Sequence, residues 1–342
     1  MVFIPLLGSA AEEWRTFTSS DGRKMEARIV SVKADSVVVD LKSNLSQIMI
    51  DFKKLSKEDV EFLKQHGAGA AQGADTVADG TLPDGEPAVG KRYPRSKEQI
   101  RDGICEIEKR PKPDEVSKEV HKATQLLNIY RFLSGVPSEV QANAAFSKSA
   151  TDAALACKQN GGLAHSLGHS TDKCNLSSMA DVTASVSQYM EDAGANNREA
   201  RGHRAWCLNP PMGKVGFGSG GDAYSAMWCM DNSGKPIRSS WAYPGKGLYP
   251  LEYLHGNAWS LYGAGQPGAP DKLKVEVFKL PKRPDKAFSA KGEIPGRVVK
   301  VNHVSIGMNA VNFEPEDANK QGVYWVRVNG GDIREGYLVE LY

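Results

Sequence analysis

Regular alternation of apolar and polar residues marks the first part of the chain. It recurs in four short stretches, which are residues 14–18, 25–32, 35–41 and 47–52. Alternation with a period of two predicts half-buried β-strands, and Ser19-Ser-Asp-Gly22 is a typical turn between two of them. Ser56-Lys-Glu-Asp59 then has the pattern of a helix N-terminus. Several short strands followed by one helical segment predict a small SH3-like β-barrel over residues 12–66.

The pattern changes twice in the next part of the chain. Residues 67–95 are rich in Gly, Ala and Pro and poor in large apolar side chains, which predicts a flexible linker. Apolar residues then repeat at helical spacing at Ile100, Ile104 and Ile107. The prolines of Arg110-Pro-Lys-Pro113 interrupt this helix, and Ser117 is placed to begin another. We therefore expect two helices within residues 96–135.

Strand patterns return after residue 265. Five stretches have them, which are residues 273–278, 297–302, 310–313, 323–328 and 337–342. Gly and Pro separate these stretches, as they do between short strands. The pattern predicts a small C-terminal β-sandwich over residues 266–342. Because helical patterns lie between two β-rich regions, the predicted fold class is α+β.

The first eleven residues have the character of a secretory signal. Residues 2–7 are mostly apolar, and Gly8-Ser-Ala-Ala11 offers small residues suited to signal peptidase. No Lys or Arg precedes the apolar run, so residues 1–11 fit a remnant of a signal peptide. The alternative is a mildly apolar chain terminus. The first interpretation predicts a protein that is secreted or located in the periplasm or cell envelope.

Charge and hydropathy narrow the possible partners. The chain has 43 basic and 41 acidic residues, and this balance gives no electrostatic basis for binding nucleic acid. No apolar run approaches the roughly 20 residues that a membrane-spanning helix needs. We therefore predict neither a nucleic-acid partner nor a membrane span.

The cysteines are the next feature with chemical meaning. The sequence contains five, and none of them forms a C-x-x-C motif. In an exported protein this count suits two disulfides and one remaining thiol. We expect Cys157 to pair with Cys174 and Cys207 with Cys229, which leaves Cys105 free. Five reduced and partly buried thiols are the alternative.

The N-terminal pattern is similar to a known module. Trp14-x-Thr-x-Thr-Ser-x-Asp-Gly-Arg-Lys-Met-Glu-Ala27 followed by Leu55-Ser-x-Glu-Asp-x-x-Phe-Leu63 resembles the endocytic-adaptor homology domain 1. That resemblance implies the SH3-like fold already predicted for residues 12–66. The adaptor family binds short peptides, but the fold by itself does not establish that function.

A second resemblance covers the centre of the chain. Leu127-Asn-Ile-Tyr-Arg-Phe-Leu-Ser-Gly-Val-Pro137, Gly161-Gly-Leu-Ala-His165 and Gly202-His-Arg-Ala-Trp-Cys-Leu-Asn-Pro-Pro211 occur in order along the chain. They resemble the CAP superfamily (cysteine-rich secretory, antigen 5 and pathogenesis-related proteins), in particular a bacterial branch. The resemblance implies a central α-β-α sandwich. We assign this domain to residues 96–265, with a helical segment at its start.

The CAP resemblance also implies a cleft with two histidines and two acids, which binds a divalent metal in some members. His165 and His203 match the histidine positions. The first acid is absent, because Lys173-Cys-Asn175 stands where the family has Gly-Glu-Asn. The second acid aligns with Glu191 or Asp192. The predicted cleft residues are therefore His165, His203, Asp192, Glu191 and Asn175.

Three interpretations of this cleft remain open. The histidines could hold a divalent metal such as zinc, line a metal-free polar cleft, or serve structure alone. His169 lies four residues after His165 and is a weaker ligand candidate. Arg204 is expected to pair with an acid or to brace backbone carbonyl groups.

Two functions follow from these expectations. The first is a non-enzymatic binding protein that engages a cell-envelope polymer, a lipid or another exported protein. The second is a metal-dependent hydrolase or protease that uses His165 and His203. They differ in whether the cleft needs a stoichiometric metal and a group that activates water.

Overall fold

The computed structural model describes residues 14–32, 35–42, 47–70, 93–284, 288, 292–316 and 319–342. The chain divides into two compact units, Met1–Ala78 and Asp79–Tyr342. Both contain helices and strands, which confirms the α+β class. The predicted signal-peptide segment 1–11 and most of the predicted linker lie outside the described residues.

The first unit is an antiparallel meander with a helix. Its strands follow the order β1 (Arg15–Thr18), β2 (Lys24–Val32), β3 (Ser36–Leu41) and β4 (Gln47–Asp51). A short 3-10 helix η1 (Phe52–Lys54) and helix α1 (Lys57–Ala70) follow. Phe17, Val37 and Leu63 lie in its core. Within the described residues the four-stranded sheet is not closed into a barrel.

The predicted start of helix α1 is confirmed. The backbone N–H of Asp59 donates to the Ser56 hydroxyl at 3.2 Å, which satisfies a donor that has no partner inside the helix. The Asp59 carboxylate also accepts hydrogen bonds from Arg15 and from the backbone of Thr18. One buried acid therefore joins the helix to the first strand.

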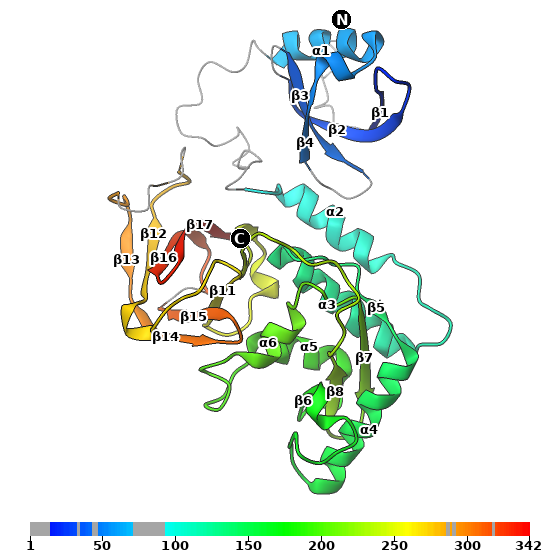
Figure 1. Ribbon diagram of the computed structural model, residues 1–342, viewed down its shortest axis with the longest axis vertical. Coiled ribbons are helices and arrows are strands. Elements are labelled where there is room, and N and C mark those ends of the chain that lie inside the picture. The colour runs from blue at the N-terminus through cyan, green and yellow to red at the C-terminus, as the bar shows by residue number, and fades with distance from the viewer. Residues whose placement is uncertain are drawn as a thin grey trace, which may run out of the picture. The chain divides into compact units, whose positions relative to one another are not determined.

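The second unit contains a three-layer arrangement. Its sheet has the order β5 (Gln141–Ala142), β7 (Lys214–Ser219), β8 (Ser225–Trp228) and β6 (Cys174–Ser177). Helix α4 (Ala144–Asn160) packs on one side of β7 and β8, and α3 (Lys118–Ser134) and α5 (Val182–Glu191) pack on the other (Figure 1). The sheet is therefore covered by helices on both faces.

Alternation along β7 explains the two faces. Val215 and Phe217 join the core shared with α3 and α5. Gly216 and Gly218 face α4, where an added Cβ would meet helix backbone at about 2.1 Å. Glycine at these positions lets the helix approach the strand closely.

Helix α2 (Lys97–Glu108) precedes α3, and residues 109–117 separate the two helices. This confirms the predicted pair of helices and the break at the prolines. Ser117 caps α3 by accepting a hydrogen bond from the N–H of Val120, also as expected. The 3-10 helix η2 (Thr171–Lys173) leads directly into β6, and α6 (Gly202–Cys207) carries His203, one of the predicted cleft residues.

Two further sheets complete the second unit. One has the order β10 (Gly247–Tyr249), β17 (Ile333–Leu341), β16 (Gly322–Gly330), β12 (Lys274–Leu280) and β13 (Arg297–Val299). The other has the order β14 (Val301–Gly307), β15 (Ala310–Pro315), β11 (Trp259–Tyr262) and β9 (Trp241–Tyr243). The short 3-10 helices η3 (Leu251–Tyr253) and η4 (Pro270–Lys272) connect strands of this region.

The five predicted C-terminal strands are all present in these sheets. Trp259 of β11 packs edge-on against Tyr324 of β16, with 5.7 Å between ring centroids, so the sheets share a core. Strands β9, β10 and β11 precede residue 265 yet belong to the same two sheets. The C-terminal sheets therefore draw on residues from both sides of the predicted boundary at 265/266. Among the described residues, no helix has the length and apolar character needed to cross a membrane.

Candidate functional site

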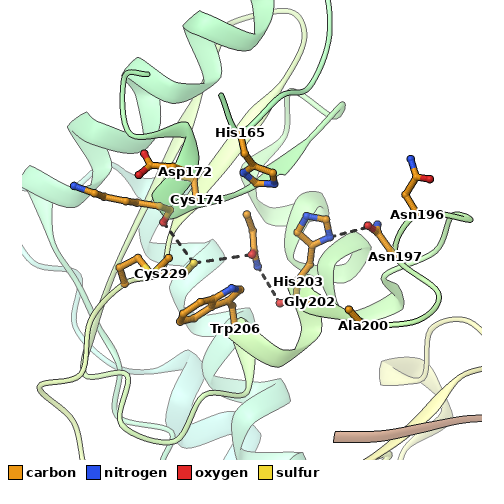
Figure 2. Close-up of a pocket in the computed structure, with 13 residues that line it drawn as sticks. His165, Asp172, Cys174, Asn196, Asn197, Ala200, Gly202, His203, Trp206 and Cys229 are labelled. Carbon is orange, nitrogen blue, oxygen red and sulfur yellow. Dashed lines mark hydrogen bonds between the residues drawn. The ribbon is translucent and has the colours of Figure 1, made fainter. Parts of the chain in front are cut away.

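The candidate site is a pocket of about 320 Å³ in the second unit. Figure 2 shows His165, His203 and Trp206 around the same space. Four segments form its walls, which are the loop before β6, the start of β6, residues 196–206 and the residues just after β8. The pocket brings together three of the five predicted cleft residues, His165, Asn175 and His203, and a fourth, Asp192, lies directly behind His203.

The ring of His203 is held in one orientation by Asp192. Its Nδ1 lies 2.7 Å from Oδ1 of Asp192, whose side chain is fully buried. The carboxylate can only accept at this contact, so Nδ1 carries the hydrogen. Nε2 lies on the other side of the ring and has no hydrogen-bond partner among the described residues.

The backbone of Asp192 explains how its side chain reaches His203. Asp192 ends α5 with a positive φ of 51°, which turns the chain sharply at this position. Its second carboxylate oxygen accepts a hydrogen bond from the backbone N–H of Arg204 at 3.2 Å. Asp192 therefore joins the end of α5 to the first turn of α6.

His165 is held in a similar way by a different group. Its Nδ1 donates to the carbonyl oxygen of Thr171 at 2.7 Å. The Thr171 hydroxyl donates back to the carbonyl oxygens of His165 and Gly168, so the loop is braced on both sides. Nε2 of His165 also has no hydrogen-bond partner among the described residues. His169 lies in the same loop but does not line the pocket.

Asn175 contributes a neutral group to the floor of the pocket. Its amide nitrogen donates to the carbonyl oxygen of His203 at 2.9 Å. The same amide makes long contacts with the sulfur atoms of Cys207 (3.8 Å) and Cys229 (3.9 Å). A buried amide therefore lies next to the position where the resemblance implied an acid.

Of the two candidate acids, only Asp192 lies at the cleft. Glu191 does not line the pocket, and its side chain lies beside Gly256, where an added Cβ would come within 3.0 Å of it. The last turn of α5 points the two neighbouring side chains in different directions. Of the two residues, Asp192 is the one whose carboxylate contacts a cleft histidine.

Arg204 braces backbone carbonyl groups, one of the two roles expected for it. The guanidinium is fully buried and donates to the carbonyl oxygens of Met190, Glu191 and Ala258. It also lies 4.4 Å from the centre of the Tyr243 ring. Arg204 is therefore not available to a ligand.

The loop at the pocket edge is held by the C-terminal sheets. Glu314 of β15 forms ion pairs with Arg198 and Arg201, each with a shortest distance of 2.6 Å. The hydrogen bonds from Arg198 hold the pKa of the Glu314 carboxyl below its usual value. Ser305 of β14 donates to the carbonyl oxygen of Glu199 at 2.8 Å. Residues 198–201 are thus fixed by a region of the chain more than 100 residues later in the sequence.

All five cysteines are free thiols in the structure. The structure therefore gives no support to the expected pairs Cys157–Cys174 and Cys207–Cys229. Burial raises the pKa of the Cys229 thiol to about 12, and it also raises the pKa of Cys174 and Cys207. These groups stay protonated at neutral pH, so they are poor nucleophiles.

The donor set does not fit a metal site with three protein ligands. Among the residues that the structure describes, no group of three or more His, Cys, Asp or Glu side chains is placed to hold a metal ion. His165 and His203 offer two nitrogen ligands, whereas Asp192 is used by His203 and Asn175 is uncharged. A catalytic zinc site normally has three protein ligands and an open position.

Several pocket residues were not identified from the sequence. They are Asp172, Lys173, Asn196, Asn197 and Trp206. Trp206 lies within the motif of residues 202–211, but nothing in that motif distinguishes an indole that lines a pocket from one in the core. Asn196 and Asn197 lie in a polar segment without periodicity, so only their neighbours in space give them a role.

Comparison of the chain with protein-family models, with curated protein sequences and with solved structures found no match.

Proposed function

We propose that this chain is an exported CAP-type protein that binds a component of the cell envelope in its cleft without turning it over. The layer order supports the CAP assignment, because helices cover both faces of a short sheet and the cleft histidines lie together at its end. The meander and helix of the first unit support an SH3-like module. Both assignments rest on these features together with the sequence motifs.

The observation that carries this proposal is the composition of the cleft. Two imidazole rings whose Nε2 atoms have no partner among the described residues face a neutral amide. Asp192 is buried behind His203, and Asp172 of the same pocket lies next to the opposite charge of Lys173. Such groups can form hydrogen bonds with a bound ligand. Among the residues that the structure describes, they do not form a group of three side chains that could hold a metal ion.

A metal-dependent hydrolase is the second candidate, and one observation favours it. Both Nδ1 atoms are anchored, His165 by a carbonyl oxygen and His203 by a carboxylate. Metal-binding histidines commonly have this support, which fixes the ring and its tautomer. The missing third ligand is the reason for preferring the binding function.

Co-sedimentation with cell-envelope fractions tests the binding proposal. The purified chain would be incubated separately with insoluble envelope polymer, lipid vesicles and extracted exported proteins. We expect the wild type to bind one fraction and the His165→Ala, His203→Ala double variant to lose that binding. His169→Asn is the matched control, because His169 belongs to the same loop but lies outside the pocket. Equal binding by the double variant would contradict the proposal.

Metal content and turnover separate the two candidate functions. Mass spectrometry of the purified chain after zinc exposure and desalting should find well below one zinc per chain. If one zinc per chain were bound and then lost in the double variant, and if soluble fragments were released from the bound fraction, the hydrolase function would replace the binding function.

A further inference from the structure

The pocket wall combines one aromatic ring with planar polar side chains. Trp206 is half-buried, lines the pocket and packs against the core of the second unit. Imidazole and amide groups form another part of the wall, from His165, His203, Asn175, Asn196 and Asn197. Figure 2 shows the indole at the same opening as the two imidazole rings.

Several polar atoms of this wall are available to a ligand. Neither Nε2 of His165 nor Nε2 of His203 has a hydrogen-bond partner among the described residues. The side-chain amide of Asn196 and the ammonium group of Lys173 also have no hydrogen-bond partner in the part of the chain that the structure describes. The wall therefore offers both donors and acceptors in one small space, as a ligand with several hydroxyl groups requires.

The charges around the pocket are few and opposite. Asp172 and Lys173 are adjacent and contribute one negative and one positive group. Phosphate and sulfate sites usually gather several cationic side chains, above all arginine. The nearby Arg201 is already occupied by Glu314 and by the carbonyl oxygen of Asp192. An anionic ligand is therefore disfavoured.

An acyl chain is disfavoured for a different reason. The apolar lining consists of separate groups, which are Ala200, Trp206, Met230 and the thiols of Cys174 and Cys229. A site for a lipid tail would be lined mainly by apolar side chains. At about 320 Å³ the pocket is also near the lower end of the roughly 300–1,000 Å³ range of ligand sites.

From these features we infer that the pocket binds a neutral saccharide, one sugar ring at a time, with Trp206 as the stacking surface. The C–H groups on one face of a pyranose are apolar and pack on an indole face. Its hydroxyl groups would meet the two Nε2 atoms and the side-chain amide of Asn196. This inference rests on the proposed binding function and names the chemical class of the ligand.

Isothermal titration of the full chain with a neutral trimer of N-acetylglucosamine tests the inference. We expect saturable binding by the wild type and a loss of about tenfold or more in affinity for Trp206→Ala. Trp206→Phe keeps an aromatic face and should bind within about threefold of the wild type. Trp228→Phe is the matched control, because Trp228 stacks on Phe146 and does not line the pocket. Thermal unfolding of each variant would verify that it is folded.

Other outcomes would overturn the inference in recognisable ways. Tighter binding of inorganic phosphate or of vesicles of anionic phospholipid than of the trimer would replace the saccharide by those ligands. If folded Trp206→Ala bound the trimer as tightly as the wild type, Trp206 would not be the stacking surface. If no neutral saccharide bound but co-sedimentation still depended on His165 and His203, the saccharide inference would fail while the binding function stood. If no saccharide bound and co-sedimentation did not depend on His165 and His203, both the saccharide inference and the binding function would be rejected.

Discussion

At the scale of single residues, the contact between Asp192 and His203 organises the cleft. A fully buried carboxylate lies 2.7 Å from Nδ1 and orients the ring toward the pocket. A neutral amide at the same position can satisfy the geometry, but it loses the charge that strengthens the bond.

Asp192→Asn should therefore lower the free energy of unfolding by about 2 kcal/mol. It should also weaken ligand binding, because the His203 ring would no longer be held in a single tautomer. Chemical denaturation and the nitrogen chemical shifts of the His203 ring would measure the two effects. Glu191→Gln is the control, since Glu191 does not line the pocket. If that variant lost as much stability and ligand binding as Asp192→Asn, the role given to Asp192 would be wrong.

The buried thiols predict how stability depends on pH. Folding raises the pKa of Cys229 from its ordinary value of 9.0 to about 12. The folded state therefore keeps a proton that the unfolded state loses, so this contribution to stability is complete below pH 9 and declines as pH rises toward 12. The loss is at most about 1.4 kcal/mol per pH unit for each such thiol.

We expect the denaturant concentration at the midpoint of unfolding to decrease as the pH is raised from 8 to 10.5. In Cys229→Ala this decrease should be less steep. Titration of thiols in denaturant should find five per chain. A count of one would establish the two disulfides expected from the sequence and would exclude this explanation.

At the scale of elements, the packing of α4 against β7 depends on two glycines. An added Cβ at Gly218 would lie about 2.1 Å from the backbone nitrogen of Thr151, and backbone atoms cannot move aside as a flexible side chain can. The helix would have to shift away from the strand, which exposes the alanine-rich contact surface of α4.

Gly218→Ala should destabilise the second unit by about 2–3 kcal/mol. Gly162→Ala serves as the comparison, because its nearest neighbour outside the adjoining residues is 4.0 Å away. Thermal unfolding of both variants would measure the difference. Similar midpoints of thermal unfolding for the two variants would mean that α4 and β7 are not closely packed at Gly218.

At the scale of the second unit, the C-terminal sheets support the pocket. Glu314 holds Arg198 and Arg201, and Arg201 also donates to the carbonyl oxygen of Asp192. Glu314 of the C-terminal sheets is therefore connected through Arg201 to the backbone of Asp192, the residue that holds His203.

Glu314→Gln should reduce the stability of the second unit by about 1 kcal/mol at neutral pH and should weaken ligand binding. The pKa of Glu314 is lowered from 4.5 in the folded state, so its contribution is present above pH 4.5 and is lost as pH falls through the lowered pKa. The stability difference between wild type and variant should shrink accordingly in acid. A difference that stays constant down to pH 2 would contradict the role given to the ion pairs.

Much of the fold could be predicted from the sequence because its elements follow local rules. The Ser56 and Ser117 caps, the break at Arg110-Pro-Lys-Pro113 and the C-terminal strands depend on periodicity, capping and proline geometry. These signals act between neighbours along the chain, so no knowledge of distant contacts is needed. The sheet boundary near residue 265 was harder, since β9 and β11 are short and gain their partners from strands far along the chain.

The candidate site was predicted only in part for the same reason. The motifs pointed to His165, His203 and Asn175, and they left Glu191 and Asp192 as alternatives. Which acid faces the histidine depends on the turn at the end of α5. Trp206 lies on α6 and Asn196 in the segment before it, and strands β14 and β15 hold residues 198–201 between them. By itself the sequence determined the elements, because hydrophobic period and capping are local. Only the tertiary structure decided which polar side chains share the pocket, because that depends on contacts between residues far apart in the chain.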